Sequence, residues 1–111
     1  MLDDNRGQEE YVRQVVEAYH KTPGTMGTVR QPDRLLAAKL YQRGVSVSVI
    51  ENALVLAAVR RLIRPANTPP LGTVRSLAYF LPVIEEVLDL KVGPGYFQYL
   101  RQKLARMAPI R

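Results

Sequence analysis

The apolar residues of this chain recur mostly at every third or fourth position, which is the repeat of one face of an α-helix. Near the N-terminus, Tyr11, Val15 and Tyr19 follow this repeat, and Lys21 closes the pattern just before a proline and two glycines. Similar patterns follow, separated by residues that end helices. They predict about five helices, over residues 7–21, 32–44, 46–63, 73–90 and 96–107.

The second and third predicted helices meet at the short turn "QRGVS", much as two helices do in a helix-turn-helix unit. Gly44 suits the positive backbone φ angle that such a turn needs, and Ser46 suits the N-cap of the third helix. Three apolar residues have the spacing that would hold the two helices together: Val45, Ile50 and Ala53. We therefore expect a helix-turn-helix-like corner within residues 33–63.

The third helix allows two interpretations. Its first turns would expose small or polar side chains to base edges, and the candidate base contacts are Ser46, Ser48 and Asn52. Beyond Asn52, however, the helix is apolar almost all round, which is typical of a buried helix. A helix that enters a DNA groove must present one whole face. We therefore favour a buried central helix, packed by the first, second and fourth helices.

Pro82 interrupts the fourth pattern, "TVRSLAYFLPVIEEVLDL". Inside a regular helix, a proline removes one backbone hydrogen bond and clashes with the carbonyl four residues earlier, at a cost of about 3 kcal/mol. The sequence therefore predicts either a kink near Leu81 or two helices that meet at Pro82.

The composition narrows the class of protein. A chain of 111 residues with 47% hydrophobic residues is long and apolar enough for one core. It contains no cysteine, which excludes disulfides, thiolate nucleophiles and cysteine-built zinc sites. The polar N-terminus is unlike a signal peptide, and no apolar run has the length of a membrane span. We expect one cytoplasmic, soluble helical domain over residues 1–111.

The charge is uneven along the chain. Residues 1–59 contain as many acidic as basic side chains, so the net charge of +6 lies in residues 60–111. Such asymmetry attracts polyanions, but a net charge of this size is also common on small domains, where it serves solubility alone. The candidate phosphate contacts form two groups, Arg60, Arg61, Arg64 and Arg75 in the first and Arg101, Lys103 and Arg106 in the second. Tyr96 and Tyr99 could stack on exposed bases, although tyrosines at this spacing more often lie in a core.

Signals of enzymatic or metal chemistry are weak. His20 is the only histidine, so a surface or capping role is favoured over catalysis. "GTMG" has the G-x-x-G form of the KH-domain loop, but a KH domain needs a sheet that this chain does not offer. Glu85, Glu86 and Asp89 form an acidic patch that is best interpreted as an exposed face paired with basic groups. We expect no enzyme, cofactor or metal site.

The stretch "LAAKLYQRGVSVSVIENALVLAAVRRLIRP" and the run "RSLAYFLPVIEE" resemble the helical C-terminal segments of bacterial plasmid and mobile-element proteins of the replication-initiator type. The likeness covers about residues 33–104. It rests on the general sequence pattern and not on a defined motif, so no functional residue is carried over from that family. It implies a DNA-associated accessory domain in bacteria, and it allows this chain to be one domain of a longer protein.

Two functions follow as hypotheses. The leading one is a nonenzymatic nucleic-acid-binding domain, with DNA favoured, in replication or mobile-element biology. Its main rival is a protein-protein interaction domain, in which excess apolar helical surface forms a homodimer or docks a protein partner. A continuous basic surface would favour the first hypothesis, and a large exposed apolar patch would favour the second.

Overall fold

The computed structural model describes residues 2–65, 67–69, 71–90 and 93–107. Over these ranges the chain is all-helical, as the sequence predicts, and the single isolated pairing of extended backbone joins Thr25 to Val74. No described helix has the combination of length and apolar character needed to cross a bilayer. The elements are α1 (Leu2–Lys21), α2 (Gln31–Gln42), α3 (Val47–Leu62), the 3₁₀ helix η1 (Leu77–Phe80), α4 (Leu81–Asp89) and α5 (Pro94–Met107).

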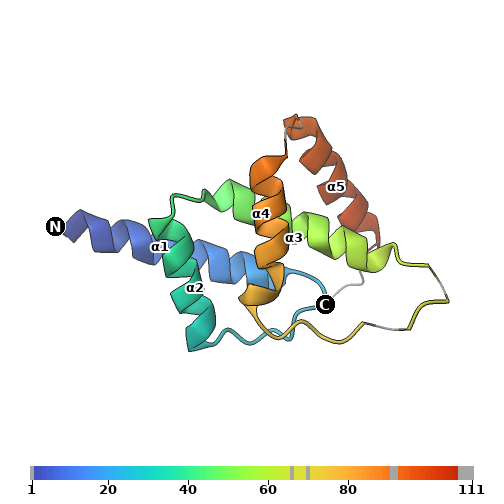
Figure 1. The fold of residues 1–111 in the computed structure, drawn as a ribbon, viewed down its shortest axis with the longest axis horizontal. Coiled ribbons are helices and arrows are strands. Elements are labelled where there is room, and N and C mark those ends of the chain that lie inside the picture. Colours follow the sequence, from blue (N-terminus) through green and yellow to red (C-terminus); the bar gives the residue numbers. More distant parts are fainter. Residues whose placement is uncertain (1, 66, 70, 91–92, 108–111) are drawn as a thin grey trace.

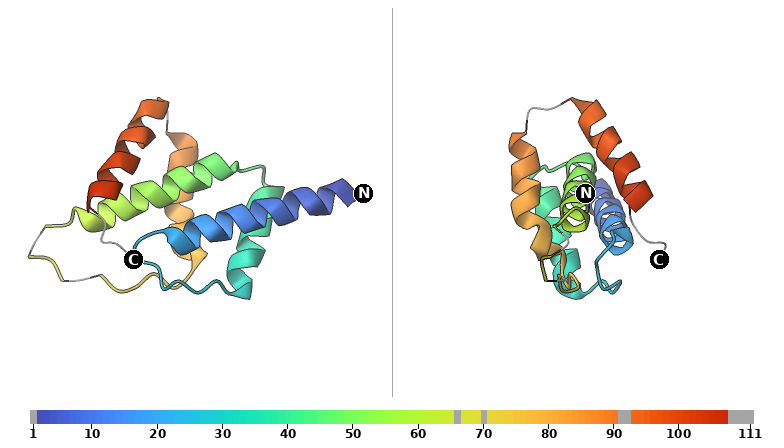
Figure 2. Two further views of the ribbon diagram at one scale, coloured as in Figure 1. Left: turned by 180° about the vertical axis from the view of Figure 1, so that it is seen from behind. Right: turned by 90° about the vertical axis from the view of Figure 1, so that its right-hand side faces the viewer.

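The third helix lies at the centre of the bundle. It packs against α4 on one side and against α1 and α5 on the other (Figures 1 and 2). The predicted central position is confirmed, but one predicted neighbour is wrong. The second helix packs mainly on α1 and η1, and α5 takes the place on α3 that was predicted for α2. The sharp turn at Gly44 directs α2 across α1 and away from the length of α3 (Figure 1).

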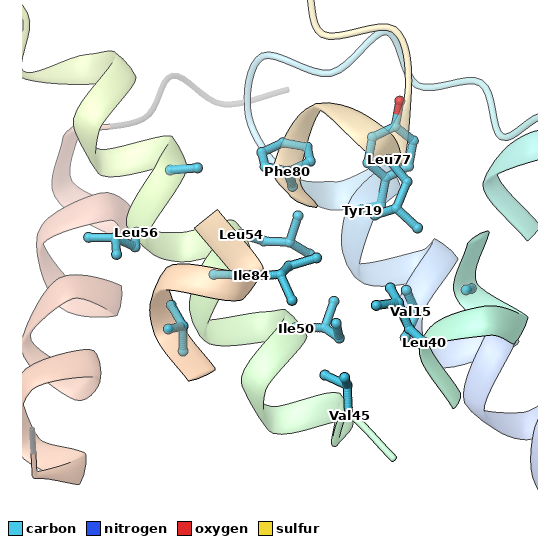
Figure 3. Packing of buried hydrophobic residues seen from close by; sticks show 14 of the residues in the cluster. Val15, Tyr19, Leu40, Val45, Ile50, Leu54, Leu56, Leu77, Phe80 and Ile84 are labelled. Atoms are coloured by element: carbon cyan, nitrogen blue, oxygen red, sulfur yellow. The ribbon is translucent and has the colours of Figure 1, made fainter. Parts of the chain in front are cut away.

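The core is one continuous cluster to which every helix contributes (Figure 3). Tyr19, Ile50 and Phe80 are among its largest fully buried side chains. Small residues within α3 let neighbouring helices approach closely, because an alanine side chain adds little width to a helix. The buried residues of α3 are Ile50, Ala53, Leu54, Leu56, Ala57, Ala58 and Val59.

The corner between α2 and α3 has the predicted features. Gly44 has a φ of 79°, and the Val45 backbone N–H donates to the carbonyl of Leu40 at 3.1 Å. Ser46 caps α3, since its Oγ accepts a hydrogen bond from the Val49 backbone N–H at 3.2 Å. This cap satisfies one of the free N–H groups at the helix start. The sequence therefore predicted this corner well.

The fourth pattern forms two short elements that meet just before Pro82. Residues 73–76 are extended or irregular, η1 covers Leu77–Phe80, and α4 begins at Leu81. Pro82 therefore occupies the first turn of α4, where a missing N–H costs no hydrogen bond within the helix. Of the two predicted alternatives, the pair of helices is confirmed. The continuous helix from residue 73 is wrong, since η1 starts only at Leu77.

The loop between α1 and α2 is hydrogen-bonded to the segment that precedes η1. The Met26 N–H donates to the Val74 carbonyl at 2.9 Å, and the Val74 N–H donates to the Gly24 carbonyl at 2.8 Å. The "GTMG" stretch is thus an interhelical loop, in which Gly24 and Gly27 adopt φ angles of 91° and 81°. It anchors the extended segment that returns from the end of α3 toward η1 (Figure 1).

A buried carboxylate makes a second connection between the same regions. Asp33, only 2% exposed, accepts a hydrogen bond from the Arg30 N–H at the start of α2. Its other oxygen accepts one from the Leu77 N–H at the start of η1, at 2.9 Å. One side chain therefore caps two helix starts that are 44 residues apart in sequence.

Candidate nucleic-acid interface

Three of the predicted phosphate contacts lie together where α3 ends. Arg60, Arg61 and Arg64 line one shallow depression, which also includes Tyr79 and the exposed side chain of Leu71. The helix supplies this arrangement directly, because residues three and four positions apart lie on neighbouring parts of one face. The arginines nevertheless differ in the groups that they contact.

Arg61 is held by uncharged oxygen atoms. Its Nη1 donates to the Tyr79 hydroxyl at 3.0 Å, and its Nη2 donates to the Gly72 carbonyl at 2.7 Å. The guanidinium carbon lies 5.6 Å from the centre of the Tyr79 ring, within the range of a cation-π contact. Gly24 lies close behind it, since a Cβ at that position would be 3.2 Å from Arg61 Nε. These contacts fix the position of the guanidinium without neutralising its charge.

Arg64 is held in the same way, and Arg75 lies on the adjoining chain segment. The Arg64 Nη1 donates to the Pro69 carbonyl at 2.7 Å. Arg75 is exposed and lies between Gly72 and Tyr79, both of which Arg61 contacts. The returning segment therefore holds Arg61 and Arg64 in one region. We call these two residues, together with the exposed Arg75 farther along the same segment, the arginine surface.

Arg60 points to α4 and is neutralised there. Its two terminal nitrogens donate to the two carboxylate oxygens of Glu86, at 2.8 and 2.5 Å. Arg43, in the corner after α2, forms an equivalent pair with Glu85 at 2.8 and 3.1 Å. The hydrogen bonds from these arginines lower the pKa of both glutamates below the ordinary carboxyl value. The predicted pairing of the acidic patch with basic groups is confirmed for Glu85 and Glu86.

The candidate base contacts lie at the opposite end of α3. Ser46 is engaged as the N-cap, Ser48 is exposed in the first turn, and Asn52 is half-buried. The Asn52 side-chain oxygen accepts a hydrogen bond from Arg101 Nη2 at 2.6 Å. A predicted base contact and a predicted phosphate contact therefore bind each other. Beyond this end α3 is buried, so it offers no whole face to a groove.

The second predicted basic group is divided along α5. Arg101 turns toward Asn52 and lines a depression that includes Ala18 of α1 and Glu51 of α3. Lys103 points along α5 instead, with its Nζ 5.9 Å from the centre of the Tyr99 ring, and Arg106 is exposed in the last turn. The structure therefore does not bring Arg101 to the arginine surface.

The two tyrosines of α5 lie at the surface, whereas tyrosines at this spacing more often lie in a core. Tyr96 and Tyr99 are 42% and 52% exposed, while Phe97 and Leu100 between and beside them are buried. Phe97 and Leu100 belong to the face of α5 that packs on α3, and the tyrosines flank that face. His20 is likewise exposed, in the last turn of α1.

Tyr79 and the carbonyls of Gly72 and Pro69 are the interface groups that sequence reasoning missed. Each contacts an arginine that is 5 to 18 residues away in the chain, across a stretch without helical periodicity. The one available signal was a tyrosine in the run "LAYFLP", where Pro82 interrupts the helical pattern. Comparison with known proteins adds no further assignment: no protein-family model, curated protein or solved structure matches this chain significantly.

Proposed function

We propose that this chain is a nonenzymatic nucleic-acid-binding domain that contacts phosphates through the arginine surface of Arg61, Arg64 and Arg75. The observation behind this proposal is the way in which Arg61 and Arg64 are held. Their described hydrogen-bond acceptors are a hydroxyl and backbone carbonyls, so both guanidinium charges stay available while their positions are fixed. Arginine presents several N–H donors that suit phosphate oxygens.

The proposed mode of binding is contact with the backbone rather than readout of bases. A surface of this kind replaces condensed counterions, which gives an affinity that falls with salt and depends little on sequence. Because α3 is buried along most of its length, we do not propose it as a recognition helix. The resemblance of residues 33–104 to replication-initiator segments favours DNA as the target, in the cytoplasm of a bacterium.

The test is a fluorescence-anisotropy titration of labelled DNA, single-stranded and duplex, at several salt concentrations. Arg64→Gln combined with Arg75→Gln should weaken binding and should reduce the slope of log affinity against log salt by about 1 for each arginine removed. The matched control is Arg60→Gln combined with Glu86→Gln, which removes an ion pair without changing the net charge. This control should bind like the wild type.

Either of two results would count against the proposal. One is the absence of DNA binding by the wild type even at low salt. The other is an equal loss of affinity in the control and in the arginine variant, because the neutralised Arg60 would then contribute as much as the available arginines.

A second function is favoured by large exposed apolar side chains, of which Ile63 and Leu71 lie near the arginine surface. Ile63 and Leu71 are 52% and 44% exposed, and Leu88 and Leu90 are exposed at the end of α4. Large apolar side chains of this kind are common in protein-protein interfaces. The rival is therefore a homodimer or a docked protein partner. Sedimentation of the wild type and of Ile63→Ser combined with Leu71→Ser tests for a dimer that dissociates in the variant.

A further inference from the structure

We propose that α5 presents a stacking surface for unpaired bases, so that the domain prefers single-stranded nucleic acid over a duplex. This inference rests on the proposed function and names its substrate class. The surface consists of Tyr96, Tyr99, Lys103 and Arg106, which we call the tyrosine stripe. The spacing of three, four and three residues places all four side chains on one side of the helix.

The two rings of the stripe are exposed and lie beside a buried face of the same helix. Phe97, Leu100 and Leu104 bury the adjacent face of α5 against the core. Tyr96 contacts the ring of Phe97 edge to face, with centroids 5.2 Å apart, so the buried ring supports the exposed one. Both tyrosines keep about half of their surface open to solvent. Rings held in place lose little conformational entropy when a second ring stacks on them.

The charges of the stripe match a nucleic acid strand. Lys103 lies over the Tyr99 ring, and Arg106 follows one turn later. A cation beside an aromatic ring can meet a phosphate while the ring meets the neighbouring base. Side chains three positions apart on a helix have Cβ atoms about 5–6 Å apart, more than the roughly 3.4 Å between stacked bases in one strand. Adjacent bases of a relaxed single strand could therefore each meet one tyrosine.

The tyrosine stripe is connected to the basic end of α3. The hydrogen bonds to Glu86 raise the pKa of Arg60, and Tyr96 of α5 lies near the same guanidinium. The end of α5 lies beside the C-terminal half of α3, against which α5 packs, in Figure 1 and in the left view of Figure 2. A duplex keeps its base faces stacked inside except at its two ends, so these rings favour the binding of single strands.

The experiment compares a labelled oligothymidine with a blunt duplex of equal length at one low salt concentration. Tyr96→Ala combined with Tyr99→Ala should weaken single-strand binding by roughly tenfold for each ring lost and leave duplex affinity within about twofold. Tyr96→Phe combined with Tyr99→Phe keeps both rings and should retain the wild-type preference. Gln98→Ala combined with Gln102→Ala is the control for exposed changes elsewhere on α5.

Each result separates this inference from the proposed function. If the alanine pair binds single strands as well as the wild type while Arg64→Gln with Arg75→Gln still weakens binding, the stacking inference is wrong and the phosphate-contact proposal stands. If the wild type binds neither DNA form, both fail. If the wild type instead forms a dimer that the alanine pair dissociates, the stripe is a protein interface and the stacking inference is overturned.

Discussion

The buried carboxylate of Asp33 offers a sharp test of how this fold is held together. The change Asp33→Ala removes two backbone hydrogen bonds, one from Arg30 N–H at 2.9 Å and one from Leu77 N–H at 2.9 Å. Loss of a helix cap costs about 1 kcal/mol. Loss of a buried hydrogen bond to a charged acceptor costs about 1.5–3 kcal/mol, since the Leu77 N–H is left without a partner. The expected destabilisation is therefore about 3 kcal/mol.

A change of this size is a large part of the total stability of a domain, which is typically 5–15 kcal/mol. For a chain of this length we expect the melting temperature to fall by roughly 10–15 °C. Asp33→Asn keeps one oxygen acceptor and should lose about half as much free energy. The assay is urea and thermal unfolding followed by far-UV circular dichroism, with amide hydrogen exchange at Leu77 as the local readout.

The control is Asp89→Ala, which removes the same group from an exposed position at the end of α4. We expect it to change the free energy of unfolding by less than about 0.5 kcal/mol. The reasoning would be refuted if Asp33→Ala were as stable as the wild type, or if Leu77 exchanged at the same rate in both proteins. Equal destabilisation by the two alanine changes would refute it as well.

Three further predictions concern stability. Tyr19→Phe should stabilise the fold by about 1 kcal/mol in urea unfolding, because the Tyr19 hydroxyl is buried and has no hydrogen-bond partner among the described residues; a loss of stability would contradict this. Ser46→Ala should cost about 1 kcal/mol through loss of the α3 cap, whereas Ser48→Ala in the same turn should be nearly neutral. Ion pairing lowers the pKa of Glu85 and Glu86, so their contribution to stability is present above the ordinary carboxyl pKa and is lost as the pH falls through the lowered values. The double change of both glutamates to Gln should therefore flatten the pH dependence of the melting temperature in the acidic range, and an unchanged profile would argue against the pairs.

Much of the fold could be predicted because helix formation is largely a local property. The apolar spacing from Ile50 to Val59 is enough to predict a buried α3, and Gly44 with Ser46 is enough to predict the corner before it. The choice of α5 over α2 as a neighbour of α3 depends on packing between distant segments. No local pattern encodes that choice, so the sequence predicted it wrongly.

In the candidate interface, too, the sequence predicts groups that are close together in the chain but not contacts between distant residues. The arginines at the end of α3 could be found from the sequence, because they lie within five consecutive residues. The sequence does not show which arginine forms an ion pair, because Arg60 pairs with Glu86, which is 26 residues away. The capping of two helix starts by Asp33 could not be predicted either, because its second partner, Leu77, follows 44 residues later.

The salt dependence of DNA binding by the wild-type protein tests the central proposal most directly. Three phosphate contacts, one for each residue of the arginine surface, predict that log affinity falls against log salt with a slope of about −3 on duplex DNA and about −2 on a single strand. Additional contacts from Lys103 and Arg106 would make the single-strand slope steeper. A slope near zero, or no binding at low salt, would contradict the assignment of this surface to nucleic acid.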